Sequence, residues 1–333
     1  MKKILYILTI LLCFVSIKTV AQSIISFNML KTDKLLKLSF ENEKNLRFMQ
    51  DTLLSVQDGT CKFEINNQSL IWIELSYNQN IQNFYLDIND SLHIMVNNND
   101  LLFYSSKTKK LNNYFQDRYK QIGKIQAKNF PIIMEKYSFE QYVSYSDSLY
   151  LANKLHFNEF ISKNEVPLKY HTLIHTHILS YPAIAKLDFP YGKGFFINGK
   201  ISFTTVDDKY YEFSNLLRGD SLYNYSDTYI LFLNKYVGYR YTKETINCGN
   251  VIDESFLLDT KSRRNYILFC YHYLKSFINN KASELLLARW ICDLASTNKS
   301  ESKCLLEDYK VYYSNSPYIN QIERFLEKLP DSK

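Results

Sequence analysis

Residues 84–96 of this 333-residue chain are FYLDINDSLHIMV, and this stretch decides the fold class. Apolar and polar side chains alternate on both sides of Asn89-Asp90, and many of the residues are β-branched or aromatic. Alternation with a period of two predicts a half-buried strand, and an Asn-Asp pair between two such segments predicts a turn. We therefore expect residues 84–88 and 92–96 to be two consecutive strands.

The same pattern extends outward toward the N-terminus. Residues 35–40, 61–65 and 70–75 also alternate, and Asp, Asn and Gly residues separate them from one another. Short strands at regular spacing with turn residues between them are typical of a β-sandwich. Residues 22–106 are therefore predicted to form an antiparallel β-sandwich domain.

Beyond Lys107 the apolar residues follow helical spacing, beginning with Leu111, Tyr114 and Phe115. We expect residues 107–330 to form a mostly α-helical domain, so that the fold class is α+β. Prolines interrupt helices, and those at positions 131, 167, 182 and 190 are predicted helix boundaries. Later helices are expected at 208–218, 227–240, 261–279, 282–296, 302–313 and 317–329, the last with Ser316 as N-cap and Pro317 in its first turn.

One β-hairpin is predicted within the helical domain. Residues 195–197 and 201–203 are apolar, and Asn198-Gly199-Lys200 lies between them. Asn-Gly between apolar runs is a strong hairpin signal, because both central residues of a type I′ turn need a positive φ. The insert is expected at about residues 195–205.

The first 21 residues have the order of a secretory signal peptide. Lys2 and Lys3 precede an apolar run of about 14 residues, and small residues then lead to Ala21 and Gln22, between which we expect cleavage. A run this short does not span a bilayer, and the mature chain has no uninterrupted apolar stretch of 18 residues. We therefore expect a periplasmic or secreted protein with no stable membrane insertion after cleavage.

Composition excludes two classes of function. Removing residues 1–21 takes away three lysines and no acid, so the net charge falls from +6 to +3, which favours no nucleic-acid partner. The chain has only 8 glycines and 6 prolines, far below average usage. That scarcity disfavours glycine-rich nucleotide-binding folds, and no cofactor is expected.

Several segments resemble the amino-terminal region of exported TlpA-like thiol-disulfide oxidoreductases of Bacteroidota. They are Ala21-Gln22 and residues 56–65, 84–94, 210–213 and 229–233, and the resemblance covers most of residues 22–330. It implies a small β domain followed by a helical segment in the cell envelope. In that family a thioredoxin domain with Trp-Cys-x-x-Cys follows, and this chain has no such motif.

The expected function is therefore an exported, non-catalytic binding or scaffolding protein of the cell envelope with an unknown protein partner. One alternative is an accessory or truncated member of a thioredoxin-like disulfide oxidoreductase system, whose partner would be a thioredoxin-like protein. A second alternative is a metal-dependent hydrolase. No set of residues in the sequence forms a recognisable catalytic motif.

The hydrolase alternative depends on His171 and His175. On a helix these residues share one face at a spacing of four, which suits zinc ligands. A third ligand would have to come from elsewhere, such as His156 or Glu159. The competing interpretation is a helix with polar surface histidines.

Cysteine placement suggests one disulfide at most. Five cysteines follow the expected cleavage site, and an odd, scattered set is no disulfide framework. Cys292 and Cys304 are placed symmetrically about residue 298, so they would lie opposite each other in a helical hairpin. The alternatives are a disulfide between them in an oxidising compartment or two buried thiols.

Overall fold

The computed structural model describes residues 22–29, 35–40, 50–56, 59–67, 70–77, 80–97, 100–123, 132–198, 206–217, 226–247 and 259–330. These residues form two compact units, one ending at Asn112 and the other continuing from Asn113. The first contains strands and the second contains helices, which confirms the α+β class. The predicted signal peptide, residues 1–21, lies outside the described residues.

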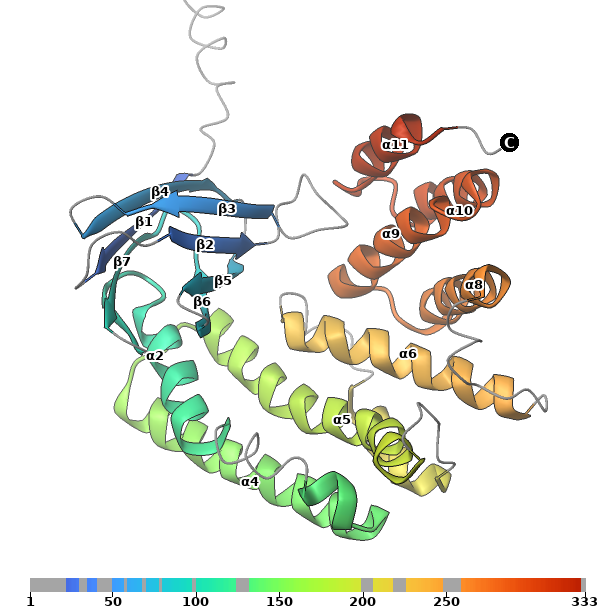
Figure 1. Cartoon of the computed structure of the whole chain (residues 1–333), viewed down its shortest axis with the longest axis horizontal. Coiled ribbons are helices and arrows are strands. Elements are labelled where there is room, and N and C mark those ends of the chain that lie inside the picture. The colour runs from blue at the N-terminus through green and yellow to red at the C-terminus, as the bar shows by residue number, and fades with distance from the viewer. Residues whose placement is uncertain are drawn as a thin grey trace, which may run out of the picture. The chain divides into compact units, whose positions relative to one another are not determined.

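The first unit consists of two four-stranded sheets (Figure 1). One has the strand order β4-β1-β7-β8 and the other β3-β2-β5-β6. The predicted strands at 35–40, 61–65, 70–75, 84–88 and 92–96 correspond to β2, β4, β5, β6 and β7. The strands are β1 (Gln22–Met29), β2 (Leu35–Phe40), β3 (Gln50–Ser55), β4 (Thr60–Asn66), β5 (Ile71–Tyr77), β6 (Asn80–Leu86), β7 (Ser91–Asn97) and β8 (Asp100–Ser105).

The prediction of a purely antiparallel unit is wrong at one pair of strands. β1 lies between β4 and β7, antiparallel to the first and parallel to the second, with Ile25 opposite Leu92. Parallel neighbours need a long connection, and here strands β2 to β6, all but β4 in the other sheet, supply it. The alternation of apolar and polar residues within a strand does not indicate whether its neighbours run parallel or antiparallel to it.

Both sheets contribute to one hydrophobic core. In β5 the burial alternates, with Ile73, Leu75 and Tyr77 inside. Ile25 and Phe27 of β1 pack in the same cluster from the other sheet. The period-two pattern of the sequence therefore faces a shared interior, as expected of two sheets packed face to face.

Buried polar contacts fix the start of α2 (Lys109–Arg118) to the strands. The Asp90 carboxylate accepts hydrogen bonds from the backbone N–H groups of Ser91 and Lys107, both at 2.8 Å. Asn112 pairs with the backbone of Tyr85, accepting from its N–H at 2.7 Å and donating to its carbonyl at 2.9 Å. Since β6 is an edge strand, Asn112 occupies hydrogen-bonding positions that no further strand fills.

In the second unit, helices follow one another along the chain and pack pairwise, α4 on α5, α5 on α6, and α8, α10 and α11 on α9 (Figure 1). One large core of aromatic and aliphatic side chains runs through them. The helical elements are α2, η1 (Tyr119–Gly123), α4 (Phe139–Lys163), α5 (Leu168–Asn198), η2 (Asp208–Leu217), α6 (Asp227–Asn247), α8 (Thr260–Phe277), α9 (Lys281–Ala295), α10 (Lys299–Tyr312) and α11 (Ile319–Lys328).

The prediction that Pro182 and Pro190 end helices is wrong, because both lie inside α5. Pro190 has no N–H, so the carbonyl of Lys186, four residues earlier, lacks its helical donor. The hydroxyl of Tyr210, on η2, donates to that carbonyl at 3.0 Å. Tertiary packing thus supplies a replacement for the missing backbone bond, and the helix continues.

The β-hairpin insert is not seen in the described residues. Residues 195–198, predicted as its first strand and the start of its turn, instead complete α5, which ends at Asn198. Residues 199–205 lie outside the described part of the chain. The apolar run that suggested a strand extends a helix already formed by the preceding residues.

Polar side chains cap the starts of several helices, but not at every position predicted from the sequence. Ser138 forms a capping box with Gln141 at the start of α4, and Asn298 caps α10. The prediction of Ser316 as the N-cap of the last helix is wrong, because α11 begins at Ile319. Its hydroxyl oxygen still accepts a hydrogen bond from the Tyr318 N–H at 3.2 Å, so Ser316 stabilises the turn before the helix.

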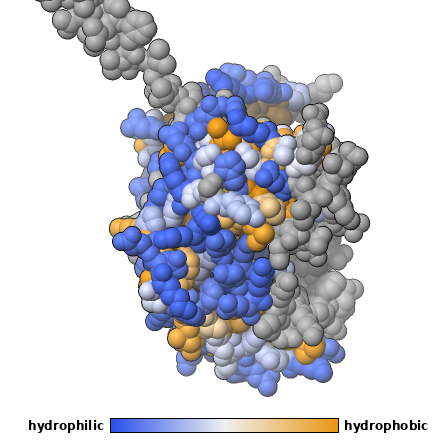
Figure 2. Space-filling model, turned by 90° about the vertical axis from the view of Figure 1, so that its left-hand side faces the viewer, coloured by the Kyte–Doolittle hydropathy of each residue, from blue (hydrophilic) through white to orange (hydrophobic). Residues whose placement is uncertain are grey.

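The face of the molecule drawn in Figure 2 is mainly hydrophilic. Hydrophobic residues on it form small, separate groups rather than one large patch. Isolated apolar residues of this kind are normal on protein surfaces. None of the helices in the described part of the chain is both long enough and apolar enough to cross a membrane.

Candidate functional site

A pocket of about 470 Å³ is lined by residues of α6, α8 and α9 in the helical unit. This volume is within the range of small-molecule sites, roughly 300–1,000 Å³. The lining residues are Asn234, Tyr241 and Thr242 of α6, Ser262, Arg263, Tyr266 and Ile267 of α8, and Leu286, Arg289, Trp290 and Asp293 of α9.

Aromatic rings form much of the pocket wall. The Tyr241 and Tyr266 rings meet edge to face with their centroids 5.2 Å apart. Trp290 is buried, with 5% of its surface exposed, so its indole is held rigidly by the core. Gly238 allows α6 to approach α8 closely, because a Cβ at that position would lie 3.2 Å from the Tyr266 hydroxyl.

The polar groups of the pocket are guanidinium, hydroxyl, amide and carboxylate groups. The lining contains two guanidinium groups, Arg263 and Arg289, and one carboxylate, Asp293. Thr242 is held by a 2.8 Å hydrogen bond to the Tyr191 hydroxyl. No histidine, cysteine or lysine is among the described residues that line it, so no lining side chain has an ordinary pKa near neutrality.

The predicted metal ligands lack the expected third partner. His171 is half-buried, and its ring packs edge to face on Phe157 at 4.8 Å. His175 keeps much of its surface exposed, and the pKa of its ring is lowered by partial desolvation and by nearby His171 and Lys154. Glu159 pairs with Lys163 at 2.6 Å. Among the described residues, no three His, Cys, Asp or Glu side chains are placed to hold a metal ion.

The structure holds Cys292 and Cys304 as thiols rather than as the predicted disulfide. Cys292 is buried in the core of α9, whereas Cys304 lies on the exposed face of α10. Symmetric spacing about a turn places two residues at the same level of a hairpin but does not fix the face on which each side chain lies. Cys270, behind the pocket wall, is also a buried thiol, and burial raises its pKa to about 12.

A buried cluster around Arg118 was not expected from the sequence. The Arg118 Nε donates to the Asn153 Oδ1 at 2.6 Å, and the guanidinium carbon lies 4.8 Å from the centre of the Tyr181 ring. His177 stacks on the same tyrosine, with its Nδ1 2.7 Å from the Thr228 hydroxyl. Arg118 Nη2 and His177 Nε2 are inaccessible to water and have no hydrogen-bond partner among the described residues. The cluster therefore packs a cationic and a neutral aromatic nitrogen group into the interior of the helical unit.

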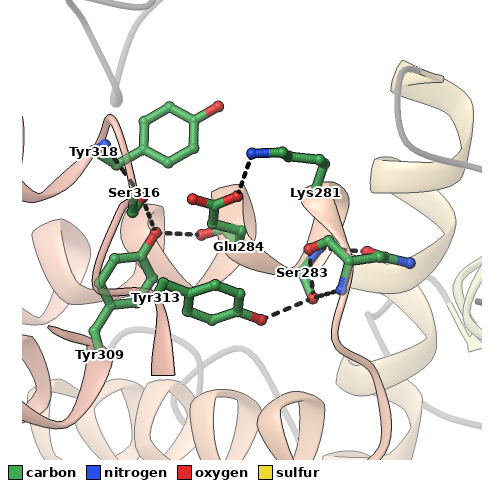
Figure 3. Close-up of polar contacts among 8 residues, drawn as sticks. Lys281, Ser283, Glu284, Tyr309, Tyr313, Ser316 and Tyr318 are labelled. Atoms are coloured by element: carbon green, nitrogen blue, oxygen red, sulfur yellow. Dashed lines mark hydrogen bonds and ion pairs between the residues drawn. The ribbon is translucent and has the colours of Figure 1, made fainter. Parts of the chain in front are cut away.

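A second polar cluster joins α9, α10 and the turn before α11 (Figure 3). The Tyr309 hydroxyl lies 3.2 Å from the Glu284 carbonyl, to which it donates, and 2.8 Å from the Ser316 hydroxyl. Tyr313 and Ser283 are joined at 3.2 Å through their hydroxyl groups. These contacts link side chains to backbone groups and helix caps, so their role is to hold the last helices together.

The pocket was missed at the level of sequence because its lining comes from three helices, and the spacing within each, such as Leu286, Arg289, Trp290 and Asp293 on α9, is that of any helix face. Its basic residues, Arg263 and Arg289, lie in ordinary helical segments. Comparison of the chain with protein-family models and with curated proteins found no match of either kind.

Proposed function

We propose that this chain is an exported, non-catalytic binding protein of the cell envelope and that it binds its ligand in the pocket between α6, α8 and α9. The observation that carries this proposal is the pocket itself, about 470 Å³ in volume and walled by aromatic rings. Its polar groups are guanidinium, hydroxyl, amide and carboxylate groups fixed by rigid helices, which suits recognition of a small molecule. The order of charged, apolar and small residues at positions 1–21 supports export.

The binding part of the proposal is tested by a fragment screen against the mature chain, with ligand-detected NMR as the readout. Asn234→Phe fills the pocket from α6, while Leu231→Phe, at an exposed position one turn earlier, is the matched control. We expect fragments that bind the native chain to lose binding in Asn234→Phe and to keep it in Leu231→Phe. Binding that survives in Asn234→Phe would contradict the assignment of the pocket.

The export part is tested separately. The full chain is produced in a Gram-negative host, and the N-terminal residue of the periplasmic product is determined by mass spectrometry. We expect a mature protein beginning at Gln22. Uncleaved protein confined to the cytoplasm would contradict export without affecting the pocket.

The accessory role in a thioredoxin-like system is supported only by the resemblance of segments such as residues 56–65 and 84–94. Two of the described thiols, Cys61 and Cys270, are unsuited to a redox role, because burial raises the pKa of each. A thiol with a raised pKa carries little thiolate at neutral pH and reacts slowly. In this alternative a thioredoxin-like partner protein supplies the dithiol.

A further inference from the structure

The described lining of the pocket contains two cationic side chains and one acidic side chain. Arg263 is exposed at the pocket, and no hydrogen bond or ion pair engages its side chain among the described residues. Arg289 adds a second guanidinium, whereas Asp293 is the single carboxylate among the described lining residues. The pocket therefore carries an excess of positive charge.

Arg264, the next residue along α8, differs from Arg263 because a carboxylate neutralises its charge. Arg264 donates from Nε and Nη2 to the two carboxylate oxygens of Glu301, at 2.6 and 2.5 Å. That bidentate pair faces α10 and is not part of the pocket lining. Asp259, the N-cap of α8, accepts from the N–H and the hydroxyl of Ser262, so its carboxylate is also engaged.

The remaining lining combines aromatic and aliphatic side chains with three small polar ones, Asn234, Thr242 and Ser262. Trp290, Tyr241 and Tyr266 present aromatic surface, and Ile267 and Leu286 are buried aliphatic residues of the lining. Flat or aliphatic groups gain from contact with such a wall, and a guanidinium binds a carboxylate or phosphate with strong, charge-assisted hydrogen bonds. A ligand that uses both features needs an acidic group next to an apolar group.

We infer that the pocket binds a small organic anion, with its acidic group at Arg263 and its apolar part against Trp290, Tyr241 and Tyr266. This inference rests on the proposed function and adds the chemical class of the ligand. The volume accommodates a molecule much larger than a simple ion. A simple ion would not contact the apolar side chains, so we expect the ligand to carry an apolar part that does.

Three probes of the same shape and different charge test the inference. They are 4-phenylbutyrate, its neutral amide and the corresponding amine, 4-phenylbutylamine, titrated into the mature chain with the Trp72→Phe substitution. Trp290 is then the only tryptophan, and its fluorescence reports on the pocket wall. We expect the carboxylate to bind with a Kd of about millimolar, as suits a fragment of this size, and the amide and amine to bind about three- to tenfold more weakly.

Arg263→Gln and Arg264→Gln form a matched pair of variants. Each removes one positive charge from α8, but only Arg263 lines the pocket. We expect Arg263→Gln to weaken carboxylate binding about three- to tenfold and to leave binding of the amide unchanged, while Arg264→Gln leaves both unchanged. Circular dichroism of each variant checks that the helical unit is folded.

The outcomes separate this inference from the proposed function. Equal or tighter binding of the amide or amine, or equal loss in both arginine variants, would overturn the anionic class and leave the pocket as a binding site. Absence of binding by all three probes would also overturn the anionic class if other fragments still bind in the screen. If nothing binds in either experiment, both the inference and the proposed function are wrong.

Discussion

Removing the Tyr210 hydroxyl, as in Tyr210→Phe, should destabilise the helical unit, because it leaves a backbone carbonyl of α5 without a hydrogen-bond donor. That hydroxyl donates to the Lys186 carbonyl, which has no helical donor because Pro190 lies four residues later. Tyr210 is 8% exposed, so water does not replace the lost donor readily. Loss of a buried hydrogen bond that leaves its acceptor unsatisfied costs about 1–2 kcal/mol in the free energy of unfolding.

The substitution Pro190→Ala tests whether the missing N–H of Pro190 is the reason that the Tyr210 hydroxyl stabilises the helical unit. In Pro190→Ala the new N–H bonds the Lys186 carbonyl within the helix, as in any regular helix. Tyr210→Phe should then cost less than about 0.5 kcal/mol, which corresponds to a coupling energy of about 1 kcal/mol between the two positions. Urea unfolding of the parent, the two single variants and the double variant measures this coupling, followed by Trp290 fluorescence in a Trp72→Phe background.

Tyr142→Phe serves as the control for removal of a phenol oxygen. The Tyr142 ring stacks on Phe189 at 3.8 Å in the same aromatic cluster, and no hydrogen bond from its hydroxyl is present among the described residues. We expect this variant to unfold within about 0.5 kcal/mol of the parent. If Tyr210→Phe costs as much in the Pro190→Ala background as it does with Pro190 in place, the argument that the tyrosine replaces the missing backbone donor is refuted.

Three other predictions concern burial and hydrogen bonding. Burial, and to a lesser degree a nearby arginine, holds the pKa of His177 well below its ordinary value, so the unfolded chain takes up a proton below about pH 6.5 that the folded chain does not. Its unfolding free energy should therefore fall between pH 7 and pH 5, by up to about 1.4 kcal/mol per pH unit from this residue, and His177→Gln should reduce that slope in urea titrations. Iodoacetamide at pH 8 should alkylate exposed Cys304 much faster than buried Cys270, whose thiol pKa is raised to about 12 by burial, as measured by peptide mapping. Asn112→Ala removes both hydrogen bonds to the Tyr85 backbone and should lower the unfolding free energy of the β unit by about 2–3 kcal/mol, followed by Trp72 fluorescence in a Trp290→Phe background.

Each of these predictions has a control and a contradicting result. An unchanged pH slope in His177→Gln would show that other groups govern acid sensitivity. Faster alkylation of Cys270 than of Cys304 would contradict the burial of its thiol. Asn113→Ala, at the adjacent half-buried position, should change stability by less than about 0.5 kcal/mol, and an equal loss in both asparagine variants would mean that the Tyr85 contacts are not the cause.

Local pattern predicted most of the strands and many of the helices. Residues 35–40 were predicted as a strand and form β2 with the same bounds, since alternation over a half-buried surface is visible in one segment alone. The helix expected at 282–296 is observed as Lys281–Ala295, because its apolar face repeats every three to four residues. By contrast, β1, β3 and β8 were not identified individually, although Ile25 and Phe27 of β1 do alternate with polar neighbours.

Predictions from neighbouring residues alone were wrong where a residue far along the chain stabilised a different local structure. Pro190 is a helix breaker in isolation, but Tyr210 compensates for the lost donor and α5 continues to Asn198. The same continuation turned the expected strand at residues 195–197 into helix. Of the two alternatives for Cys292 and Cys304, the structure has the thiols, and spacing along the chain could not decide between them because it does not determine which helix faces meet.

The sequence by itself determined the fold class, since the change from a two-residue to a 3.6-residue period after Lys107 separates strands from helices. Only the tertiary structure decided the parallel pairing of β1 with β7 and the position of the pocket. Strand direction and pocket shape depend on contacts between residues far apart in the chain, whose free energies no local pattern contains. Nothing in the local sequence distinguishes Arg263 or Trp290 from other helical residues, and they share a pocket only because α8 and α9 pack together.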